Sequence, residues 1–353
     1  MIASRRQLLV GVLAGLAGFS ALARAARAGG PGAVRLGSQP ASLPDVMFSE
    51  AMTRDRILAA QLAAAGMRLD EHPFAKGREM VGQLAARTLD VALFGDMPTI
   101  MATLETDLAV VGLVKQTFSS VVGHHLRSMA DLKGLKIAFA PGSTAHYTLM
   151  QGLHAAGLGA DDVTLVPMEI SEMPKALAEG RVAAFAAWEP APAIALERDA
   201  KAILVHRGLN ASFMVMRRQL VNDQPKAARA IAAAFLRAVN WMRMSGANLN
   251  RVAGWAVEAG LRFNAAADSP VTARQIAEIT RRELLEVPAA PSIPARLFAD
   301  GQVLHREFEF LKDHRIVPAD SSWDRVKGSF APGLMAGIIA DGRSAGIDEY
   351  DYG

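Results

Sequence analysis

Short apolar runs alternate with amphipathic stretches along the chain from Val34 onward. Apolar runs bounded by turn residues are typical of buried strands, and the longer stretches repeat their apolar residues at helical spacing. This alternation predicts βαβ units rather than a sandwich, and therefore an α/β fold. The predicted strands are residues 34–37, 67–72, 91–94, 136–140, 163–167 and 182–187. The predicted helices are residues 54–65, 79–87, 131–133, 144–156, 174–178, 225–244, 248–258, 270–286 and 294–314.

Two segments of the chain echo each other, at residues 84–96 and 177–189. Each runs from a helix into a buried strand that ends in a carboxylate, Asp96 or Glu189, with a proline close behind. Because the order of the surrounding blocks repeats as well, we interpret the chain as two similar α/β lobes.

The boundaries of the lobes follow from this interpretation. The chain must cross between the lobes twice, and two extended apolar segments can make the crossings, residues 113–124 and 212–217. The expected division is lobe 1 at residues 34–118 and 213–335, and lobe 2 at residues 119–212. Residues 336–353 are rich in glycine and acidic side chains, so we expect a flexible tail there.

The first 28 residues have the pattern of an export signal. Arg5 and Arg6 precede an apolar run at residues 8–22, and Ala26 and Ala28 are the small residues of a cleavage site. This order is that of a secretory signal, and the arginine pair indicates the twin-arginine (Tat) route. The alternative is a membrane anchor, but about 15 moderately apolar residues fall short of the ~20 that span a bilayer. We therefore expect an exported, periplasmic protein.

Composition narrows the class of protein. With 51% hydrophobic and 21% charged residues, the 353-residue chain is globular in composition rather than disordered. It contains no cysteine, which excludes disulfides, thiolate metal sites and cysteine catalysis. Four of the 38 basic residues lie within residues 1–28, which hold no acidic residue, so the remainder carries 34 basic against 35 acidic side chains. A body balanced in this way gives no reason to expect nucleic acid as a partner.

The motifs for catalysis, metals and nucleotides are absent or out of context. Gly342-Arg343-Ser344-Ala345-Gly346 matches the nucleophile-elbow pattern, but no histidine follows it, and a flexible tail is the better interpretation. His124 and His125 would point to opposite faces of a strand, and no other spacing suits zinc or calcium ligands. Neither glycine-rich nucleotide fingerprint is present. We therefore expect no catalytic residue, no metal and no cofactor.

The loops that follow the predicted strands carry the candidate binding chemistry. Pro141-Gly142-Ser143-Thr144 leads from a strand into a helix, where the glycine admits a ligand close to the backbone and Ser143 or Thr144 can cap the helix. Gly95-Asp96-Met97-Pro98, with Asp96 fitting a helix N-cap, forms a similar end in lobe 1, and Lys76-Gly77-Arg78 forms a third. Helix N-termini carry unpaired N–H groups and a partial positive charge, so two of them facing each other across a cleft would bind an anion.

Two further residues each allow two interpretations. His146 could face the cleft, or it could cap a helix or pack in the core. Trp188 could line a pocket, or it could simply end a core strand. The sequence pattern alone does not decide between them.

Three segments resemble a known family. Residues 131–138 (Asp-Leu-Lys-Gly-Leu-Lys-Ile-Ala) and 141–147 (Pro-Gly-Ser-Thr-Ala-His-Tyr) closely resemble ABC-transporter substrate-binding proteins for aliphatic sulfonates, taurine and nitrate. Residues 89–98 resemble the strand-Gly-Asp-x-Pro segment of that family, and Trp188-Glu189-Pro190 resembles its Trp-Asp-Pro element. Ala191 stands where an aromatic residue commonly follows.

The resemblance implies a two-lobed type II periplasmic binding protein fold, in which each lobe is a mixed sheet flanked by helices and two hinge strands join the lobes. The lobes would close around a small anionic solute and present it to the membrane permease and ATPase of an ABC importer. The protein would act as a monomer, without enzymatic activity. By position, the implied ligand-binding residues are Ser38, Gln39, Gly77, Arg78, Gly95, Asp96, Met97, Gly142, Ser143, Thr144, His146, Trp188 and Glu189.

Two alternatives to a transport protein remain open at this point. An enzyme on the same scaffold, related to the synthesis of the thiamine pyrimidine precursor, would form a product from its ligand. A sensor or adaptor would bind a solute without feeding a permease. Neighbouring permease and ATPase genes would distinguish a transport protein from a sensor. The sequence does not name the solute among sulfonates, taurine and nitrate.

Overall fold

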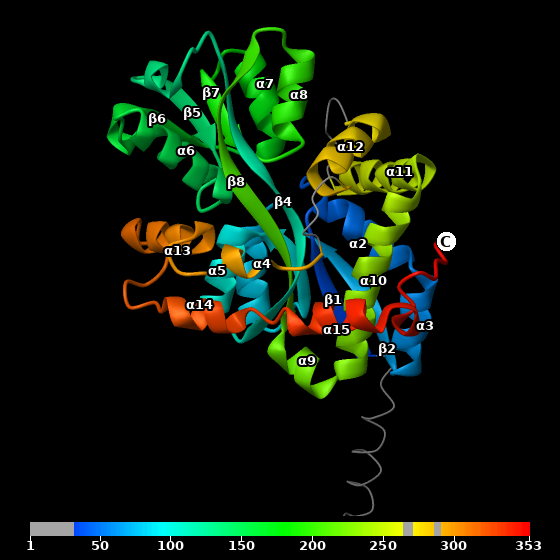
Figure 1. Cartoon of the computed structure of the whole chain (residues 1–353). Coiled ribbons are helices and arrows are strands. Elements are labelled where there is room, and N and C mark those ends of the chain that lie inside the picture. The colour runs from blue at the N-terminus through cyan, green and yellow to red at the C-terminus, as the bar shows by residue number, and fades with distance from the viewer. Residues whose placement is uncertain (1–31, 264–270, 286–290) are drawn as a thin grey trace, which may run out of the picture.

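The computed structural model describes residues 32–263, 271–285 and 291–353 (Figure 1). The predicted export signal, residues 1–28, lies outside the described residues. Within these ranges, every helix is too short or too polar to cross a bilayer.

One mixed sheet of eight strands runs through the molecule, in the order β2-β1-β3-β8-β4-β7-β5-β6. The strands are β1 (Gly32–Ser38), β2 (Met67–Pro73), β3 (Val91–Gly95), β4 (Leu108–His124), β5 (Lys136–Phe139), β6 (Thr164–Pro167), β7 (Ala184–Ala187) and β8 (Ala202–Arg217). The three strands at each end of the order pair in parallel with one another, whereas β4 and β8 are antiparallel to each other and to their neighbours. All six strands predicted from the sequence are present.

The two long central strands connect the lobes. They pair from Leu108 opposite Arg217 to His124 opposite Ala202, and they carry the chain from one lobe to the other (Figure 1). The crossings predicted at residues 113–124 and 212–217 lie within β4 and β8. Lobe 1 is the part built on β1–β3, and lobe 2 is the part built on β5–β7.

Helices cover both faces of the sheet in lobe 1. One face packs against α2 (Asp45–Arg54), α3 (Arg56–Ala64), α10 (Pro225–Met244) and α11 (Gly246–Phe263), and the other against α4 (Gly77–Ala85), α5 (Asp96–Glu105), α13 (Val303–Asp313) and α14 (Trp323–Ser329). In β3, Val91 and Leu93 belong to the first core, while Ala92 and Phe94 belong to the second. Because both faces are covered, this strand is a continuous apolar run rather than an alternating one.

Lobe 2 is smaller. Its core packs β5–β7 against α6 (Thr144–Ala155), α7 (Met173–Ala178) and α8 (Ala191–Arg198), with Ile137, Leu149 and Phe185 among its buried residues. Short 3₁₀ turns at Met129–Leu132, Ala160–Asp162 and Ile170–Glu172 complete it.

Several helices of the described residues were not predicted, among them α2 and α8. In α2, Ser49 and Glu50 are buried together with the apolar residues, so that the helix has little polar face. An amphipathic period therefore does not appear in its sequence, and this period is the signal on which helix prediction depends.

The C-terminal helices agree in part with the prediction. The helix α10 has the predicted ends, and α9 (Arg218–Asp223) precedes it. The stretch predicted to be helical at residues 270–286 contains α12 (Ala273–Thr280) and a π-helical turn at Arg281–Leu285. The single helix predicted at residues 294–314 is wrong. A 3₁₀ turn at Ala295–Leu297 is separated from α13 by Gly301, whose φ of +73° interrupts the helix.

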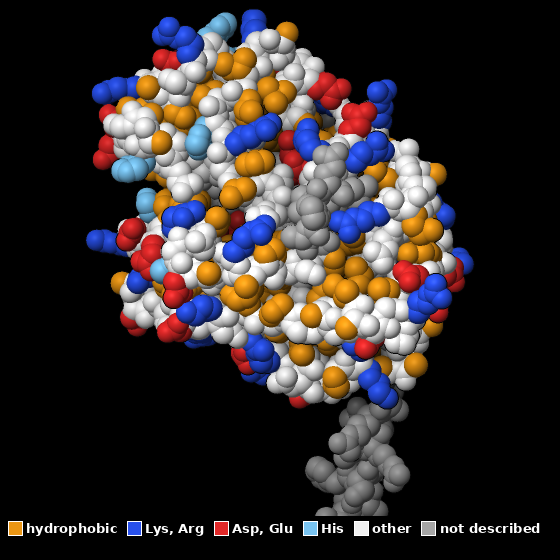
Figure 2. All heavy atoms as spheres, viewed as in Figure 1, with side chains coloured by type: hydrophobic (Ala, Val, Ile, Leu, Met, Phe, Trp, Pro, Cys, Tyr) orange, Lys and Arg blue, Asp and Glu red, His pale blue; other side chains and the backbone are white. Residues whose placement is uncertain are grey.

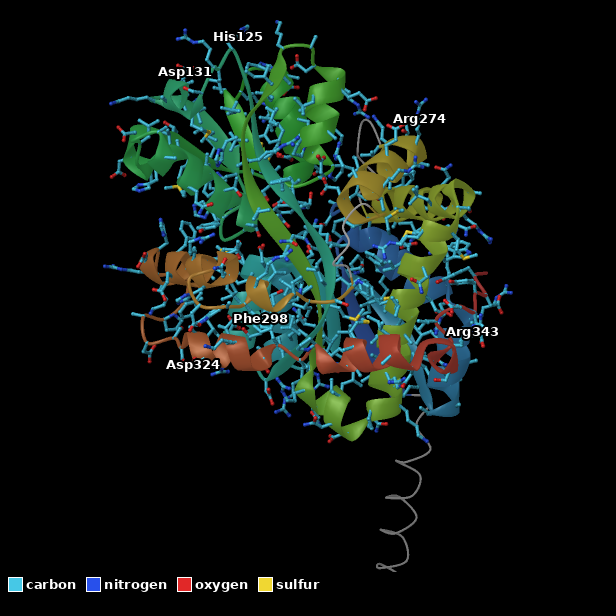
Figure 3. All side chains as sticks on the ribbon, viewed as in Figure 1. His125, Asp131, Arg274, Phe298, Asp324 and Arg343 are labelled. Atoms are coloured by element: carbon cyan, nitrogen blue, oxygen red, sulfur yellow. The ribbon has the colours of Figure 1, made fainter. Side chains whose placement is uncertain are left out.

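The last residues differ from the expected flexible tail. After α15 (Gly333–Asp341) and a 3₁₀ turn at Gly342–Ala345, the chain lies against lobe 1, where Arg343 marks its position in Figure 3. Tyr352 forms a bridge with Asp55 and packs on Trp241, with ring centroids 4.3 Å apart. The fully buried Arg237 pairs with Asp55 at 2.7 Å. Aromatic and charged partners far away in the sequence therefore hold this segment in place.

Candidate functional site

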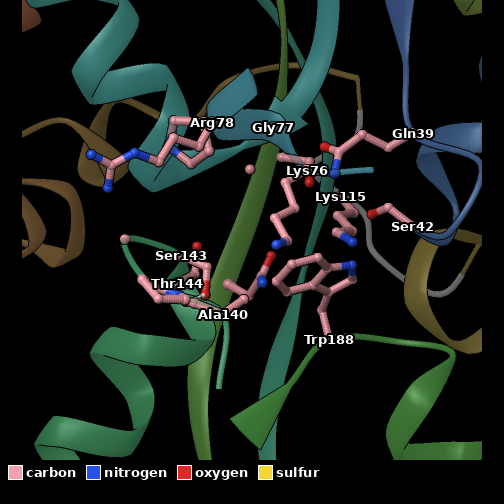
Figure 4. Close-up of a pocket in the computed structure, with 16 residues that line it drawn as sticks. Gln39, Ser42, Lys76, Gly77, Arg78, Lys115, Ala140, Ser143, Thr144 and Trp188 are labelled. Atoms are coloured by element: carbon pink, nitrogen blue, oxygen red, sulfur yellow. Dashed lines mark hydrogen bonds between the residues drawn. The ribbon is translucent and has the colours of Figure 1, made fainter. Parts of the chain in front are cut away.

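A pocket lies between the two lobes, and strand-end loops and the two hinge strands line it (Figure 4). Its lining residues are Gln39, Ser42, Lys76, Gly77, Arg78, Gly95, Pro98, Lys115, Ala140, Pro141, Gly142, Ser143, Thr144, Trp188, Asn210 and Ser212. Eight of the thirteen residues implied by the resemblance are among them: Gln39, Gly77, Arg78, Gly95, Gly142, Ser143, Thr144 and Trp188.

The start of α4 forms the lobe 1 rim of the pocket. Gly77 fits there because it lacks a side chain: a Cβ would lie 2.9 Å from Pro98 Cγ and 3.0 Å from Phe94 Cβ. Next to it, Lys76 Nζ pairs with Glu169 Oε1 of lobe 2 at 2.5 Å. This ion pair joins the two lobes at the rim.

Arg78 reaches across the cleft toward the loop between β5 and α6. Gly142 in that loop has a φ of +71°, and a Cβ there would lie 2.5 Å from Arg78 Nη1. Glycine is therefore needed at this position for two reasons, the left-handed backbone and the close approach of the guanidinium. No carboxylate among the described residues pairs with Arg78, which leaves its charge available to a ligand.

Ser143 caps α6, as one of the two alternatives from the sequence predicted. Its hydroxyl accepts a hydrogen bond from His146 N–H at 3.2 Å and donates one to the Ala140 carbonyl at 2.7 Å. The N–H groups of Thr144 and Ala145 have no partner within the described ranges, so the helix end keeps two donors for a ligand. The partial positive charge of the helix N-terminus adds to them.

Trp188 satisfies both interpretations offered by the sequence. It ends the buried strand β7 and belongs to the lobe 2 core, and it also lines the pocket. Its indole Nε1–H is buried without a hydrogen-bond acceptor among the described residues. An indole N–H is a donor only, so this group adds to the demand for an acceptor in the pocket.

The hinge strands supply the base of the pocket. Lys115, only 2% exposed, donates from Nζ to the Leu43 carbonyl at 2.6 Å and pairs with Asp45 Oδ2 at 3.1 Å. Asn210 and Ser212 come from β8, the strand that pairs with β4.

Sequence reasoning missed Ser42, Lys115, Asn210 and Ser212. For Lys115 a signal existed, because it is a lone cation directly after the apolar run of residues 108–114. A cation inside a predicted buried strand points to a partner or a ligand. The other three are small polar residues without a distinctive neighbourhood in the sequence.

Asp96 was predicted to bind ligand, and the structure places it behind the pocket wall. It is fully buried, and it accepts hydrogen bonds from Ala211 N–H at 2.7 Å, from Met97 N–H at 2.8 Å and from the Thr144 hydroxyl. The N-cap position of α5 belongs to Gly95, one residue earlier than predicted. Burial raises the pKa of Asp96 to about 6, and the hydrogen bond from Thr144 opposes that shift. Asp96 thus connects lobe 1, the hinge strand β8 and lobe 2.

Three more predicted residues do not line the pocket. Ser38 and Met97 are buried beneath it, the latter in a lobe 1 core. Glu189 accepts a hydrogen bond from Ala193 N–H and one from Arg282, both at 3.1 Å. Burial raises the pKa of Glu189, as does the neighbouring Glu283.

His146 packs behind the loop that carries Gly142 and does not line the pocket. It lies against Phe139 and Phe310, with centroid distances of 4.7 Å and 5.4 Å, and its Nδ1 accepts the N–H of Gly142 at 3.4 Å. Burial lowers the pKa of His146 to about 4, with a further contribution from His314. A neutral imidazole is the form that can accept the Gly142 N–H.

The electrostatics of the pocket favour an anion. Among its described lining residues, three are cationic and none is a carboxylate. Figure 2 shows Lys and Arg side chains along the waist between the lobes. The described residues contain no cluster of three or more His, Cys, Asp or Glu side chains that could hold a metal ion. His125, one of the adjacent histidine pair, lies at the far end of lobe 2 (Figure 3). The arrangement can hold an anion with side-chain cations, hydroxyls and backbone N–H groups alone.

Comparisons with known proteins agree with this geometry. A model of the NMT1-like family matches residues 47–257, more than half of the chain. A putative aliphatic sulfonates-binding protein of Escherichia coli (strain K12) is 30% identical over 191 residues, which are 52% of this chain and 58% of that protein. The chain therefore matches little more than half the length of this curated relative.

Solved structures show the same fold. The periplasmic aliphatic sulphonate-binding protein SsuA of Escherichia coli superposes with a TM-score of 0.66, at 20% identity, over 84% of this chain and 91% of that one. The periplasmic nitrate-binding protein NrtA of Synechocystis PCC 6803 superposes with a TM-score of 0.64, at 14% identity, over 89% and 90%. The two-lobed periplasmic binding protein fold expected from the sequence is thereby confirmed.

Proposed function

The chain belongs to the NMT1-like family, and from this premise we propose that it is the solute-binding component of an ABC importer. It captures a small anion between its two lobes and delivers it to a membrane permease with its ATPase. The relatives that bind sulfonates and nitrate support an anionic solute of the sulfonate, taurine or nitrate type.

One observation carries this proposal: the inter-lobe pocket combines Arg78, with which no carboxylate among the described residues pairs, and the unpaired N–H groups of a helix N-terminus, and none of its described lining residues is a carboxylate. The other two lining cations, Lys76 and Lys115, pair with Glu169 and Asp45. Both lobes contribute, since Lys76 and Arg78 come from lobe 1 and Thr144 from lobe 2. An anion that bridges these groups favours the closed arrangement of the lobes.

Arg78 provides the first test. In calorimetric titrations of the parent protein with methanesulfonate, nitrate, taurine and acetate, we expect at least one of the first three anions to bind. Arg78→Gln should weaken that binding about 10- to 100-fold, since one charge-assisted hydrogen bond is worth about 1.5–3 kcal/mol. Arg274→Gln is the matched control, because Arg274 is an exposed arginine on α12 that does not line the pocket. Equal binding by both variants would contradict the proposed site.

The residue ranges of the lobes are part of the proposal. Residues 34–118 and 213–335 form lobe 1 and residues 119–212 form lobe 2, and these parts rotate about β4 and β8 as the ligand enters. Solution scattering should show a smaller radius of gyration at saturation with the bound anion. An identical profile with and without that anion would argue against closure.

Export to the periplasm by the twin-arginine route is also proposed, on the basis of Arg5 and Arg6. Changing both to lysine should retain the precursor in the cytoplasm. Cell fractionation with an antibody against the chain would measure this, and normal periplasmic levels of the Lys-Lys variant would instead indicate the general secretory route.

We further propose that the protein acts as a monomer and without enzymatic activity. The pocket holds no cysteine nucleophile, and its only titratable side chains among the described residues are cations. Mass spectrometry of each bound anion after prolonged incubation tests the lack of activity, because recovery of an altered compound would assign an enzyme.

A further inference from the structure

Two buried carboxyl groups, those of Asp96 and Glu307, lie together behind the wall of the pocket. Asp96 begins α5 directly after Gly95, which lines the pocket, and Glu307 lies on α13. Both residues are 0% exposed. Figure 1 shows α13 beside α5 and below α6 of lobe 2, and α13 contacts both helices. This carboxyl pair therefore lies where the two lobes meet.

The hydrogen bonding of the pair requires a proton. Neither carboxyl oxygen of Glu307 receives a hydrogen bond from a donor group within the described ranges. Its carboxyl group is instead in hydrogen-bond contact with the carboxyl group of Asp96. Ionised carboxylates only accept, so a hydrogen bond between two carboxyl groups needs a proton on one of them. Asp96 already accepts from two backbone N–H groups and from the Thr144 hydroxyl, so the proton belongs on Glu307.

No cation compensates the pair by direct contact. Among the described residues neither carboxyl group forms an ion pair, and the nearby Lys115 is engaged by Asp45. Lys115 acts on Asp96, and the exposed Arg306 on Glu307, only through longer-range attraction that lowers the pKa of each carboxyl group. Burial outweighs both cations, and it raises the pKa of Asp96 to about 6 and that of Glu307 well above its ordinary value. Around neutral pH the pair therefore binds and releases a proton.

Other titratable groups on the elements packed against α5 and α13 have partners elsewhere. Tyr147 of α6 faces Glu307, and burial and Glu307 both raise the pKa of that phenol above its ordinary value, so it stays neutral. The remaining groups point away from the pair: Arg78 of α4 toward Gly142, Arg325 of α14 toward the Thr103 carbonyl, and His146 of α6 toward Phe139 and Phe310. The protonation of the pair thus depends mainly on how well it is buried.

Lobe 2 completes that burial. Thr144, which lines the pocket and begins α6, donates its hydroxyl to Asp96, and an added Cβ at Gly95 would lie 3.6 Å from its Oγ1. Opening the lobes would withdraw Thr144 and admit water, which favours ionised carboxylates, whereas closing the lobes favours the protonated form. An anion in the pocket acts in the same direction, because it adds a negative charge on the other side of the same wall.

We propose that Asp96 and Glu307 form a proton-binding site coupled to the anion site, so that the protein takes up a proton as it closes on its anion. The proton comes from the solvent, binds a carboxylate oxygen of Glu307 and returns to the solvent when the lobes open. The inference rests on the proposed function and adds a regulation of the same site. Because such coupling is reciprocal, acidic conditions should strengthen anion capture and a rising pH should promote release.

Calorimetric titration of the parent protein with nitrate, methanesulfonate and taurine at several pH values tests the coupling, since none of these probes changes its charge between about pH 5.5 and 7.5. Buffers free of sulfonate and carboxylate groups avoid competition. Affinity should fall about three- to tenfold per pH unit above pH 6, the slope given by uptake of about half to one proton. A pH indicator in a weakly buffered solution should show the same uptake directly when the anion is added.

The outcomes separate this inference from the proposed function. Binding that does not change with pH, without proton uptake, would overturn the coupling and leave anion capture standing. Binding of none of the three probes would overturn both.

Glu307→Gln assigns the proton to the pair. The amide keeps the shape of the side chain and can donate to Asp96, but it does not titrate, so binding should stay near the parent's low-pH affinity at every pH. The matched control is Glu309→Gln on the same helix, where the side chain is 48% exposed, and this variant should keep the parent's pH dependence. A pH dependence that survives in Glu307→Gln would assign the proton to another group and overturn the inference. Proton uptake by the parent protein is measured independently of either variant.

Discussion

The ends of β3 and β7 form a matched pair with different surroundings. Both strands are buried, and both end in a carboxylate that lies behind the pocket, Asp96 in lobe 1 and Glu189 in lobe 2. Each carboxylate also reaches the opposite lobe, since Asp96 accepts from Thr144 and Glu189 accepts from Arg282. The two segments therefore both connect the lobes.

The difference between them lies in burial and in the partner. Asp96 is fully buried and its hydrogen-bond donors are neutral, whereas Glu189 has a cationic partner whose side chain is 55% exposed. A charge-bearing group costs more where water cannot reach it and no cation compensates it. We therefore expect the interior connection at Asp96 to be more sensitive to substitution than the connection at Glu189.

Removal of the two carboxylates should show the largest contrast. Asp96→Ala leaves the buried N–H groups of Met97 and Ala211 without acceptors, so we expect the free energy of unfolding to fall by about 3 kcal/mol or more. Glu189→Ala should cost about 1–2 kcal/mol, since Arg282 can return to water. Urea denaturation of the ligand-free proteins measures both values. Equal costs would show that the two strand ends are equivalent after all.

The next largest effect should be a difference in the pH dependence of stability between the parent protein and Asp96→Asn. Because the pKa of Asp96 is raised to about 6 in the folded protein, its favourable contribution is present in full below pH 4 and is lost as the pH rises through 6. The cost of Asp96→Asn should therefore shrink by about 2–3 kcal/mol between pH 4 and pH 7.

Neighbouring groups must be considered in that experiment. Glu307 is fully buried near Asp96, and burial and Asp96 both raise its pKa well above its ordinary value. Asp96→Asn removes one of these causes, so the measured pH dependence belongs to the two carboxyl groups together. The pKa of His146 is lowered to about 4, so its contribution to the free energy of unfolding changes in the opposite direction and is lost as the pH falls below 6.5. Because His146 is present in both proteins, this contribution cancels in the comparison. A cost of Asp96→Asn that does not change with pH would rule out the raised pKa.

The partners of the two carboxylates should give smaller effects. Thr144→Val removes the hydroxyl that donates to Asp96 and keeps the shape of the side chain, so we expect a loss of about 1 kcal/mol. It should also weaken anion binding, because it removes a contact between the two lobes that a bridging anion would favour. Thermal unfolding and calorimetry measure the two parts, and unchanged values in both would contradict the bridging role of Asp96.

Arg282→Gln should have the smallest effect of all. Its ion pair with Glu189 is half exposed, and pairs of this kind contribute about 0–1 kcal/mol. We expect a change in unfolding free energy below about 0.5 kcal/mol at moderate salt. A loss as large as that of Thr144→Val would show that the rim contact is as important as the interior one.

Much of the architecture was predictable from the sequence because its signals are local. The apolar run 91–94 and the turn at Gly95 depend on residues within a few positions of one another, and so does the Ser143 cap of α6. The failures have local causes too. In α2 a helix without a polar face lacks the period that prediction needs, and at Gly301 a positive φ divides what looked like one helix.

The candidate site could be predicted only where a loop carries its own chemistry. The loop at Gly142-Ser143-Thr144 was predicted to line the cleft because glycine and hydroxyl residues at a strand-to-helix turn have a direct physical meaning, and it does line the pocket. Asp96, His146 and Glu189 were predicted by position to bind the ligand. In the structure their side chains accept hydrogen bonds from backbone N–H groups, and Asp96 and Glu189 also contact the opposite lobe. Whether a side chain points into the pocket or lies behind the pocket wall does not follow from its position in the sequence.

The sequence by itself determined the α/β class, the two lobes, the crossing strands and the helix that begins at the pocket. Each of these follows from periodicity or turn chemistry over a short range. Only the tertiary structure decided which side chains converge. Lys115 from a hinge strand, Arg78 from lobe 1 and Trp188 from lobe 2 meet in one pocket, and the carboxyl groups of Asp96 and Glu307 meet behind its wall. Convergence depends on contacts between segments far apart in the chain, and these are set by packing rather than by any residue's neighbours in sequence.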